Sequence, residues 1–186
     1  LERRDADRAE RPRRLADVSS PDVDIFIAFG DGNWPDRLVE LLCEVVFTPP
    51  CSPVLLNKLG GLSEPADVFR ATLLHLGDHE DWTRWLAQAR VVAPDAQSGI
   101  VFSDMNLVFA AASAGQGIAM GDELTCRTAM KEGQLIRPFD AAIKSTRSYH
   151  LVTEHSRAEQ PLLKTFAHWL KSRLIEAEAV ARNAYD

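Results

Sequence analysis

Short apolar stretches bounded by turn residues mark the expected strands. Residues 23–29 (Val-Asp-Ile-Phe-Ile-Ala-Phe) are β-branched and aromatic and stop at Gly30-Asp31-Gly32, which predicts a strand that runs into a turn. Residues 38–47 predict a second strand, because this apolar run ends before a cluster of prolines at 49, 50 and 53. Residues 149–153 predict another strand near the C-terminal end of the sequence.

Helical periodicity separates and follows these strands. Trp82, Trp85, Leu86 and Ala89 fall at i, i+3, i+4 and i+7, so one helical face carries them all. Three further helices are expected to begin at residues suited to a helix start, namely Ser103 or Asp104, Asp122, and Pro161. In the last helix an apolar residue recurs every four positions, at Leu162, Phe166, Leu170 and Leu174. The tryptophans at helical spacing, Trp169 included, are interpreted as core residues.

Strands that alternate with helices predict an α/β protein with at least partly parallel sheets. The prolines near residue 50 and the region of Pro138 are the expected crossings between two lobes. Lobe I is predicted to comprise residues 1–49 plus 146–186, and lobe II, inserted between them, residues 50–145. Lobe pairs of this kind close on small ligands by hinge movement, so a ligand-binding cleft is the expected functional feature.

The charge balance argues against several functions. With a formal net charge of −6 and a pI near 5.4, the chain offers no basic face for phosphates, so nucleic-acid binding by this segment is disfavoured. No apolar run approaches the roughly 20 residues that span a bilayer, and the residues after Leu1 lack a signal-peptide core. We therefore expect a soluble, cytoplasmic protein without membrane contact. The three cysteines, Cys43, Cys51 and Cys126, predict buried thiols and not a disulfide framework or zinc site.

A family resemblance rests on several segments that occur in collinear order between residues 17 and 174. These segments are residues 23–35, 51–53, 73–75, 81–85, 102–104, 111–112, 115–119, 133–139 and 149–152. Together they resemble the sensing domain of LysR-type transcriptional regulators, in particular the branch of the glycine-cleavage and β-lactamase-inducing regulators. The resemblance implies a two-lobed, type 2 periplasmic-binding-protein-like fold with a hinge and a cleft that binds a small effector.

The same resemblance implies partners and missing parts. Family members assemble as homodimers or tetramers and contact DNA through an N-terminal winged helix-turn-helix domain, which we expect to be absent from this chain. Leu1 enters the family pattern at its second strand, so lobe I is expected to be incomplete at its N-terminus. The loss of a central strand would expose the edges of its neighbours, which favours association.

The resemblance also implies effector-binding residues. Ala28, Phe29 and Gly30 match a strand end that faces the cleft in relatives. Many relatives carry Arg at the position of Ala28, so an acidic effector becomes a weaker expectation without that guanidinium. Ser103 and Asp104 offer a hydroxyl and a helix N-terminus, although plain helix capping explains them equally well. Met105 replaces a second hydroxyl of close relatives and predicts a more apolar pocket.

Two more residues carry alternative interpretations. Tyr149 matches a tyrosine that lines the cleft in the β-lactamase-regulator branch, and the alternative is an ordinary strand aromatic in the core. Asp17 matches an acid at the hinge or cleft rim, and a solvated loop charge is the favoured alternative.

The remaining motifs predict no catalysis, metal or cofactor. His75 and His79 have the spacing of a helical metal pair, but Gly77 interrupts the helix and the segment predicts a strand followed by a turn. The glycines at 30 and 32 lack the third glycine of a dinucleotide loop. Three hypotheses follow: an effector-sensing domain of a regulator, a solute-binding protein of a transport system, and a small hydrolase or transferase. The third lacks a recognisable nucleophile and base.

Overall fold

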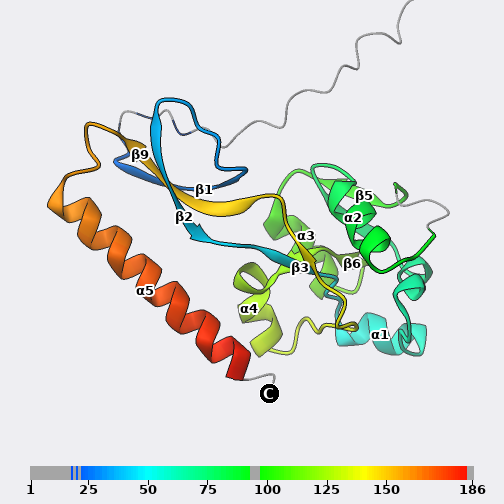
Figure 1. Cartoon of the computed structure of the whole chain (residues 1–186). Coiled ribbons are helices and arrows are strands. Elements are labelled where there is room, and N and C mark those ends of the chain that lie inside the picture. The colour runs from blue at the N-terminus through cyan, green and yellow to red at the C-terminus, as the bar shows by residue number, and fades with distance from the viewer. Residues whose placement is uncertain (1–17, 19, 21, 93–96, 184–186) are drawn as a thin grey trace, which may run out of the picture. The chain divides into compact units, whose positions relative to one another are not determined.

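The computed structural model describes residues 18, 20, 22–92 and 97–183. Internal contacts divide the chain into two compact units (Figure 1), and each is described by itself. The first unit consists of Leu1–Glu44 and Thr146–Asp186, and the second of Val45–Ser145. The lobe boundaries expected at residues 49/50 and 145/146 stay a prediction, whereas the compact units divide at 44/45 and 145/146.

The first unit is built on a three-stranded antiparallel sheet with the order β1-β9-β2. Its described elements are β1 (Ile25–Gly30), β2 (Arg37–Cys43), β9 (Ser148–Glu154) and α5 (Pro161–Asn183). The strands predicted at residues 23–29 and 149–153 and the helix predicted to begin at Pro161 are thereby confirmed. Because β9 lies between the other two strands, its residues 150–153 are all buried.

The two faces of this sheet bury different side chains. On one face Ala28 and Val152 pack with Trp34 in a small apolar cluster. On the other face α5 covers the sheet, and Leu163 is the most deeply buried of the side chains described in this helix, at 8% exposure. Leu162, expected in the apolar stripe of this helix, is 77% exposed instead. The stripe is therefore displaced by one residue at its start.

The strand predicted over residues 38–47 is wrong as a single element. The chain leaves β2 after Cys43 and enters β3 (Val46–Thr48), which belongs to the second unit. A register shift between Leu41 and Cys43 already disturbs the pairing of β2 with β9. Irregular pairing of this kind bends a strand away from its sheet, which allows the chain to cross between units here.

The second unit contains a parallel and an antiparallel sheet, with the strand orders β5-β4-β6 and β7-β3-β8. Its described strands besides β3 are β4 (Leu73–Leu76), β5 (Ile100–Phe102), β6 (Ile118–Ala119), β7 (Gly121–Asp122) and β8 (Ile143–Lys144). Its helices are α1 (Pro53–Leu59), the 3-10 helix η1 (Pro65–Arg70), α2 (Glu80–Gln88), α3 (Met105–Ser113) and α4 (Glu123–Lys131). The predicted mixture of helices with partly parallel strands is confirmed.

Trp82 and Trp85 of α2 anchor the interior of the second unit. Both are at most 1% exposed, and their rings meet edge to face at 5.7 Å. Each indole N–H also donates to a backbone carbonyl, Trp82 to Leu74 at 3.1 Å and Trp85 to Ala141 at 2.9 Å. Buried indoles usually need such a partner, and here the two bonds join α2 to β4 and to the segment at Ala141. The helical face predicted from the tryptophan spacing is confirmed.

Helix starts in this unit follow the predicted capping residues. The Asp104 carboxylate accepts from the Asn106 backbone N–H at 2.7 Å and caps α3. The Asp122 carboxylate accepts from Leu124 and Thr125 and caps α4. These bonds satisfy backbone donors that have no partner within the helix. Among the described residues, no helix is both long and apolar enough to cross a membrane.

Candidate functional site

In the first unit, an aromatic and cationic cluster forms where β1 ends. Phe29 and Tyr149 are register partners on adjacent strands, and their ring centroids lie 5.1 Å apart. The guanidinium carbon of Arg147 lies 5.0 Å from the centroid of the Phe29 ring. This geometry is a cation–π contact. The cluster combines half-buried aromatic surface with a positive charge, which suits a planar or anionic ligand group.

The neighbouring residues of β1 contribute little side-chain surface. Ala28 is only 1% exposed and packs in the core with Trp34 and Val152. Gly30 is buried and pairs with Ser148 at the end of the sheet. The turn that follows is the turn expected from the sequence, with Gly32 at φ +87°, in the region that favours glycine.

In the second unit, the three expected effector contacts follow one another where β5 passes into α3. Ser103 is exposed, and Asp104 is exposed but already bonded to the Asn106 N–H. Met105 is half-buried and packs against the core that includes Val108. Ser103 therefore offers an exposed hydroxyl, and Asp104 offers an exposed carboxylate that also caps α3. Asp17, the expected hinge or rim acid, lies outside the described residues.

A histidine pair lies beside this segment in the same unit. His75, in β4, is 1% exposed, and its Nδ1 lies 3.2 Å from Nδ1 of His79. The other ring nitrogen, Nε2, lies 2.9 Å from the carbonyl oxygen of Ser98. Burial lowers the pKa of His75 below its ordinary value, and the neighbouring His79 adds to this effect. The neutral form of His75 is thus favoured.

The strand and turn predicted for this segment are confirmed, yet the two rings still meet. Gly77, at φ +72°, reverses the chain after β4 and brings His79 back over His75. Across the described residues, no group of three or more His, Cys, Asp or Glu side chains is arranged to hold a metal ion. We therefore interpret the contact between His75 and His79 as a hydrogen bond between their rings.

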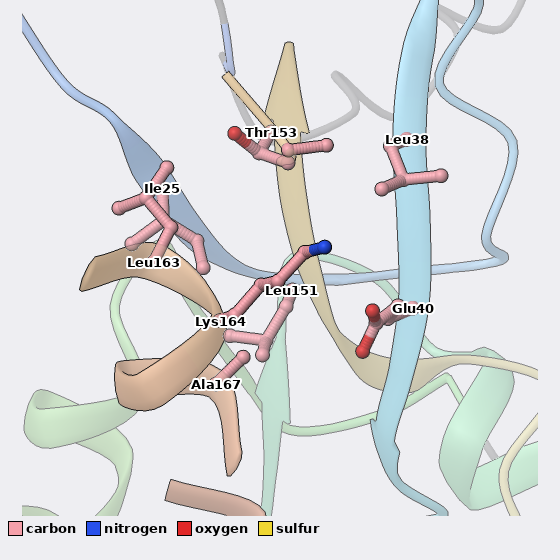
Figure 2. Close-up of a pocket in the computed structure, with 9 residues that line it drawn as sticks. Ile25, Leu38, Glu40, Leu151, Thr153, Leu163, Lys164 and Ala167 are labelled. Atoms are coloured by element: carbon pink, nitrogen blue, oxygen red, sulfur yellow. The ribbon is translucent and has the colours of Figure 1, made fainter. Parts of the chain in front are cut away.

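The first unit contains a small cavity between α5 and the sheet (Figure 2). Its volume is about 40 Å³, and aliphatic side chains such as Ile25, Leu151 and Leu163 form most of its wall. Glu40 of β2 and Lys164 of α5 contribute the charged groups of the lining. A cavity of this size holds one or two water molecules at most, so it is too small for an effector.

A larger cavity, of about 190 Å³, lies in the second unit. Its wall includes Phe139 and the ion pair of Arg137 with Glu123, whose nitrogen and oxygen atoms are 2.8 Å apart. The two charges satisfy each other, so a ligand that used either would have to separate them. None of the expected effector contacts Ser103, Asp104 and Met105 lines this cavity.

Two of the cysteines are buried thiols as predicted. Burial raises the pKa of Cys51 to about 11 and that of Cys126 to about 12. The thiolate, which is the reactive form, is therefore scarce at neutral pH for both. Cys43 is only half-buried, so the prediction of a buried thiol does not hold for it.

Comparison with known proteins identifies the family of this chain. The LysR substrate binding domain family matches residues 7–175. The chain belongs to this family. The glycine cleavage system transcriptional activator of Escherichia coli K12 is 32% identical over 173 residues, which are 93% of this chain and 57% of that protein. The transcriptional activator AmpR of Enterobacter cloacae is 30% identical over 85% of this chain and 53% of its own length.

Solved structures agree with the sequence comparison. The effector binding domain of AmpR from Citrobacter freundii superposes with a TM-score of 0.74 at 27% identity, over 83% of this chain and 76% of that one. The predicted α/β, type 2 periplasmic-binding-protein-like fold of LysR substrate binding domains is thereby confirmed. The chain spans about half the length of the curated LysR-type relatives that it matches.

Sequence reasoning missed two parts of this LysR-type domain. Arg147 carries no motif and directly precedes β9, so only the strand alternation extended back from Tyr149 could have placed it on the same face as Phe29 and Tyr149. His75 and His79 were considered only as a metal pair on a helix, so the contact between their rings was not predicted. A strand followed by a tight turn and a helix start brings residues i and i+4 together by another route.

Proposed function

We propose that this chain is the effector-sensing domain of a LysR-type DNA-binding transcriptional regulator, in which a small molecule controls transcription. The observation that carries the proposal is the family match over residues 7–175, supported by relatives that are transcriptional activators. DNA contact through a helix-turn-helix domain outside this chain, assembly as a homodimer or tetramer, and a cytoplasmic location are parts of the same proposal. A solute-binding role in transport is not favoured, because the relatives named above are regulators and not transport proteins.

The first unit is proposed to bind the effector through the cluster of Phe29, Tyr149 and Arg147. Aromatic surface supports a flat or apolar part of the ligand, and a guanidinium supports a carboxylate or phosphate. The sequence argument against acidic effectors rested on the absence of Arg at position 28. Because Arg147 supplies a guanidinium next to Phe29, acids belong among the first compounds to test.

The second unit is proposed to bind the effector through Ser103 and the first turn of α3. The hydroxyl of Ser103 can donate to a ligand carbonyl or carboxylate, and helix N-termini favour negative charge. Met105 is proposed as an apolar contact beside the hydroxyl, and Asp104 mainly as the residue that keeps the helix start in place. Ala28 and Gly30, which are buried, backbone included, are proposed to border the effector site beside Phe29.

Thermal unfolding of the purified chain with a panel of amino acids, cell-wall fragments and aromatic acids tests effector binding. A compound that binds only the folded state stabilises it by about 2.7 kcal/mol at 100 times its dissociation constant. We expect one class of compound to raise the midpoint temperature of the unfolding transition. Ser103→Ala and Tyr149→Leu, which removes the aromatic ring, should each remove most of the shift, so a shift that survives both would reject these residues as contacts.

A matched control separates contact from general destabilisation. Ser63, like Ser103, is an exposed serine directly before a helix N-cap in the second unit. Ser63→Ala should leave the ligand-induced shift unchanged. The regulatory part of the proposal is tested with the full-length protein on its promoter DNA. A stabilising compound that altered neither DNA binding nor transcription would contradict it.

A further inference from the structure

The histidine pair in the second unit has a fixed pattern of protons. A backbone carbonyl only accepts hydrogen bonds, so the Nε2 of His75, 2.9 Å from the Ser98 oxygen, must carry a hydrogen. In a neutral imidazole the other nitrogen is then an acceptor. The Nδ1 of His79, 3.2 Å from the Nδ1 of His75, must therefore donate to it. This arrangement requires His75 to be neutral.

The pair is connected to both ends of β5. Just before the strand, the His75 Nε2–H donates to the carbonyl of Ser98. The next residue, Gly99, packs closely here, because an added Cβ would lie 2.9 Å from the His75 Nε2 and 2.1 Å from the Leu73 oxygen. At the end of the strand, the Gly77 backbone N–H donates to the carbonyl of Phe102 at 2.8 Å. Phe102 directly precedes Ser103, so the turn between the two histidines is bonded to the residue before the proposed effector contact.

From these contacts we infer that the hydrogen bond between His75 and His79 positions the end of β5, and with it Ser103, and that protonation of both rings releases it. The pair acts as a positioning device with a pH-dependent state. Its consequence for sensing rests on the proposed function, because it assumes that Ser103 contacts the effector.

A single added proton leaves the bond intact, because the Nδ1 of one ring can still donate to the Nδ1 of the other. When both rings are protonated, two N–H donors face each other and their like charges repel, which breaks the pair. The charged groups that act on His75 are His79 and Asp78, and the Asp78 carboxylate opposes the effect of burial. The neighbouring strands place Val101 and Ala119, which carry no charge, along β4. The release should therefore occur in the acidic range, below the ordinary pKa of histidine.

Amide hydrogen exchange on the ¹⁵N-labelled chain, measured with a chelator present, tests the inference without any effector. The reporter is the Gly77 amide, and the reference is the Ile136 amide, which bonds to the Cys51 carbonyl elsewhere in the same unit. The ratio of their protection factors separates local release from global loss of stability. Between about pH 7.5 and pH 5 we expect this ratio to fall roughly tenfold, as for one lost hydrogen bond.

Variants of His79 make the test specific. His79→Phe keeps a ring but removes the donor, so it should lower the Gly77 protection already at neutral pH. His79→Asn keeps a donor near the Nδ1 position and should restore most of the protection of the Gly77 amide. His155→Asn, a change at an exposed histidine of the first unit, serves as the control and should have no effect. Equal Gly77 protection in the wild type and in His79→Phe, or a ratio that is independent of pH, would overturn the inference.

The proposed function has a separate outcome in the ligand panel. If no compound stabilises the chain while the exchange ratio behaves as expected, effector sensing fails and the positioning role of the pair stands. If a compound stabilises the chain while the exchange ratio stays constant, sensing stands and the positioning role fails.

Discussion

The two units of this chain differ in how much interior they possess. Among the largest fully buried side chains of the described residues, Val152 is the only one from the first unit. The second unit contributes the others, including Trp82, Trp85 and His75. In the described part of the chain, the first unit has one sheet with a single helix over one face, whereas the second has two sheets and several helices in contact with them.

This difference indicates where stability and adaptability are located. Deeply buried side chains make many contacts, and their loss leaves cavities that the surroundings fill only partly. The second unit should therefore be the more resistant to unfolding. Among the described strands of the first unit, only the central strand β9 has a continuous buried run, so local opening of this unit should cost less free energy.

Replacement of a core tryptophan tests this comparison with the largest expected effect. Trp85→Ala should lower the free energy of unfolding by about 3–5 kcal/mol, since it removes a buried ring and leaves a cavity. Denaturant unfolding followed by circular dichroism measures the change. Trp34→Ala, at the 5% exposed tryptophan of the first unit, should cost less because fewer buried groups surround it. Equal losses from the two variants would break the comparison.

A glycine pair sharpens the comparison within the second unit. A Cβ at Gly99 would lie 2.1 Å from the Leu73 carbonyl oxygen, and the residue has φ +131°. Gly99→Ala should therefore cost about 1–3 kcal/mol, as other overpacked or strained sites do. Gly133→Ala is the control, because that glycine also has positive φ but open space around it. A smaller loss at Gly99 than at Gly133 would show that β5 does not pack tightly on β4.

Prediction of the fold succeeded where local rules were strong. Three helices were predicted correctly from local features, namely the capping residues Asp104 and Asp122 and the tryptophan spacing in α2. Each of these features depends only on neighbours along the chain. The run of residues 38–47 was misjudged because hydrophobicity does not show which sheet a strand joins. The bulge after Leu41 and the move to another sheet at Val46 arise from tertiary pairing.

The candidate site was harder to predict than the fold. The family resemblance indicated Phe29, Ser103 and Tyr149, but the burial of Ala28 depends on which face of β1 the core occupies. Arg147 and the histidine pair depend on contacts between elements and on a turn, so no sequence motif announces them. Sequence spacing alone had tested only a helical arrangement of His75 and His79.

The buried histidine predicts how stability changes with pH. His75 titrates near 6.5 in the unfolded chain and at lower pH in the folded one, because burial disfavours its charged form. The unfolded state therefore binds more protons in this window, so stability is highest above about pH 6.5 and is lost as pH falls towards the folded pKa. Denaturant midpoints measured between about pH 7.5 and pH 5 should show this decline.

Two variants assign that decline to the interior of the second unit. His75→Gln removes the titrating group and should flatten the acidic part of the profile relative to the wild type. His168→Asn, on the exposed face of α5 in the first unit, should leave the profile unchanged. A profile that depended on His168 and not on His75 would reverse the expected contrast between the two units.

The smallest effect is expected at the surface of α5. Its spacing predicted Trp169 as a core residue, but Trp169 is 52% exposed, and its ring centroid lies 5.9 Å from that of Phe166. Trp169→Ala should therefore change the free energy of unfolding by no more than about 0.5–1 kcal/mol, far less than Trp85→Ala. Since both changes remove the same side chain, the difference between them measures burial and not residue type. A loss at Trp169 as large as that at Trp85 would mean that this face of α5 is covered in solution.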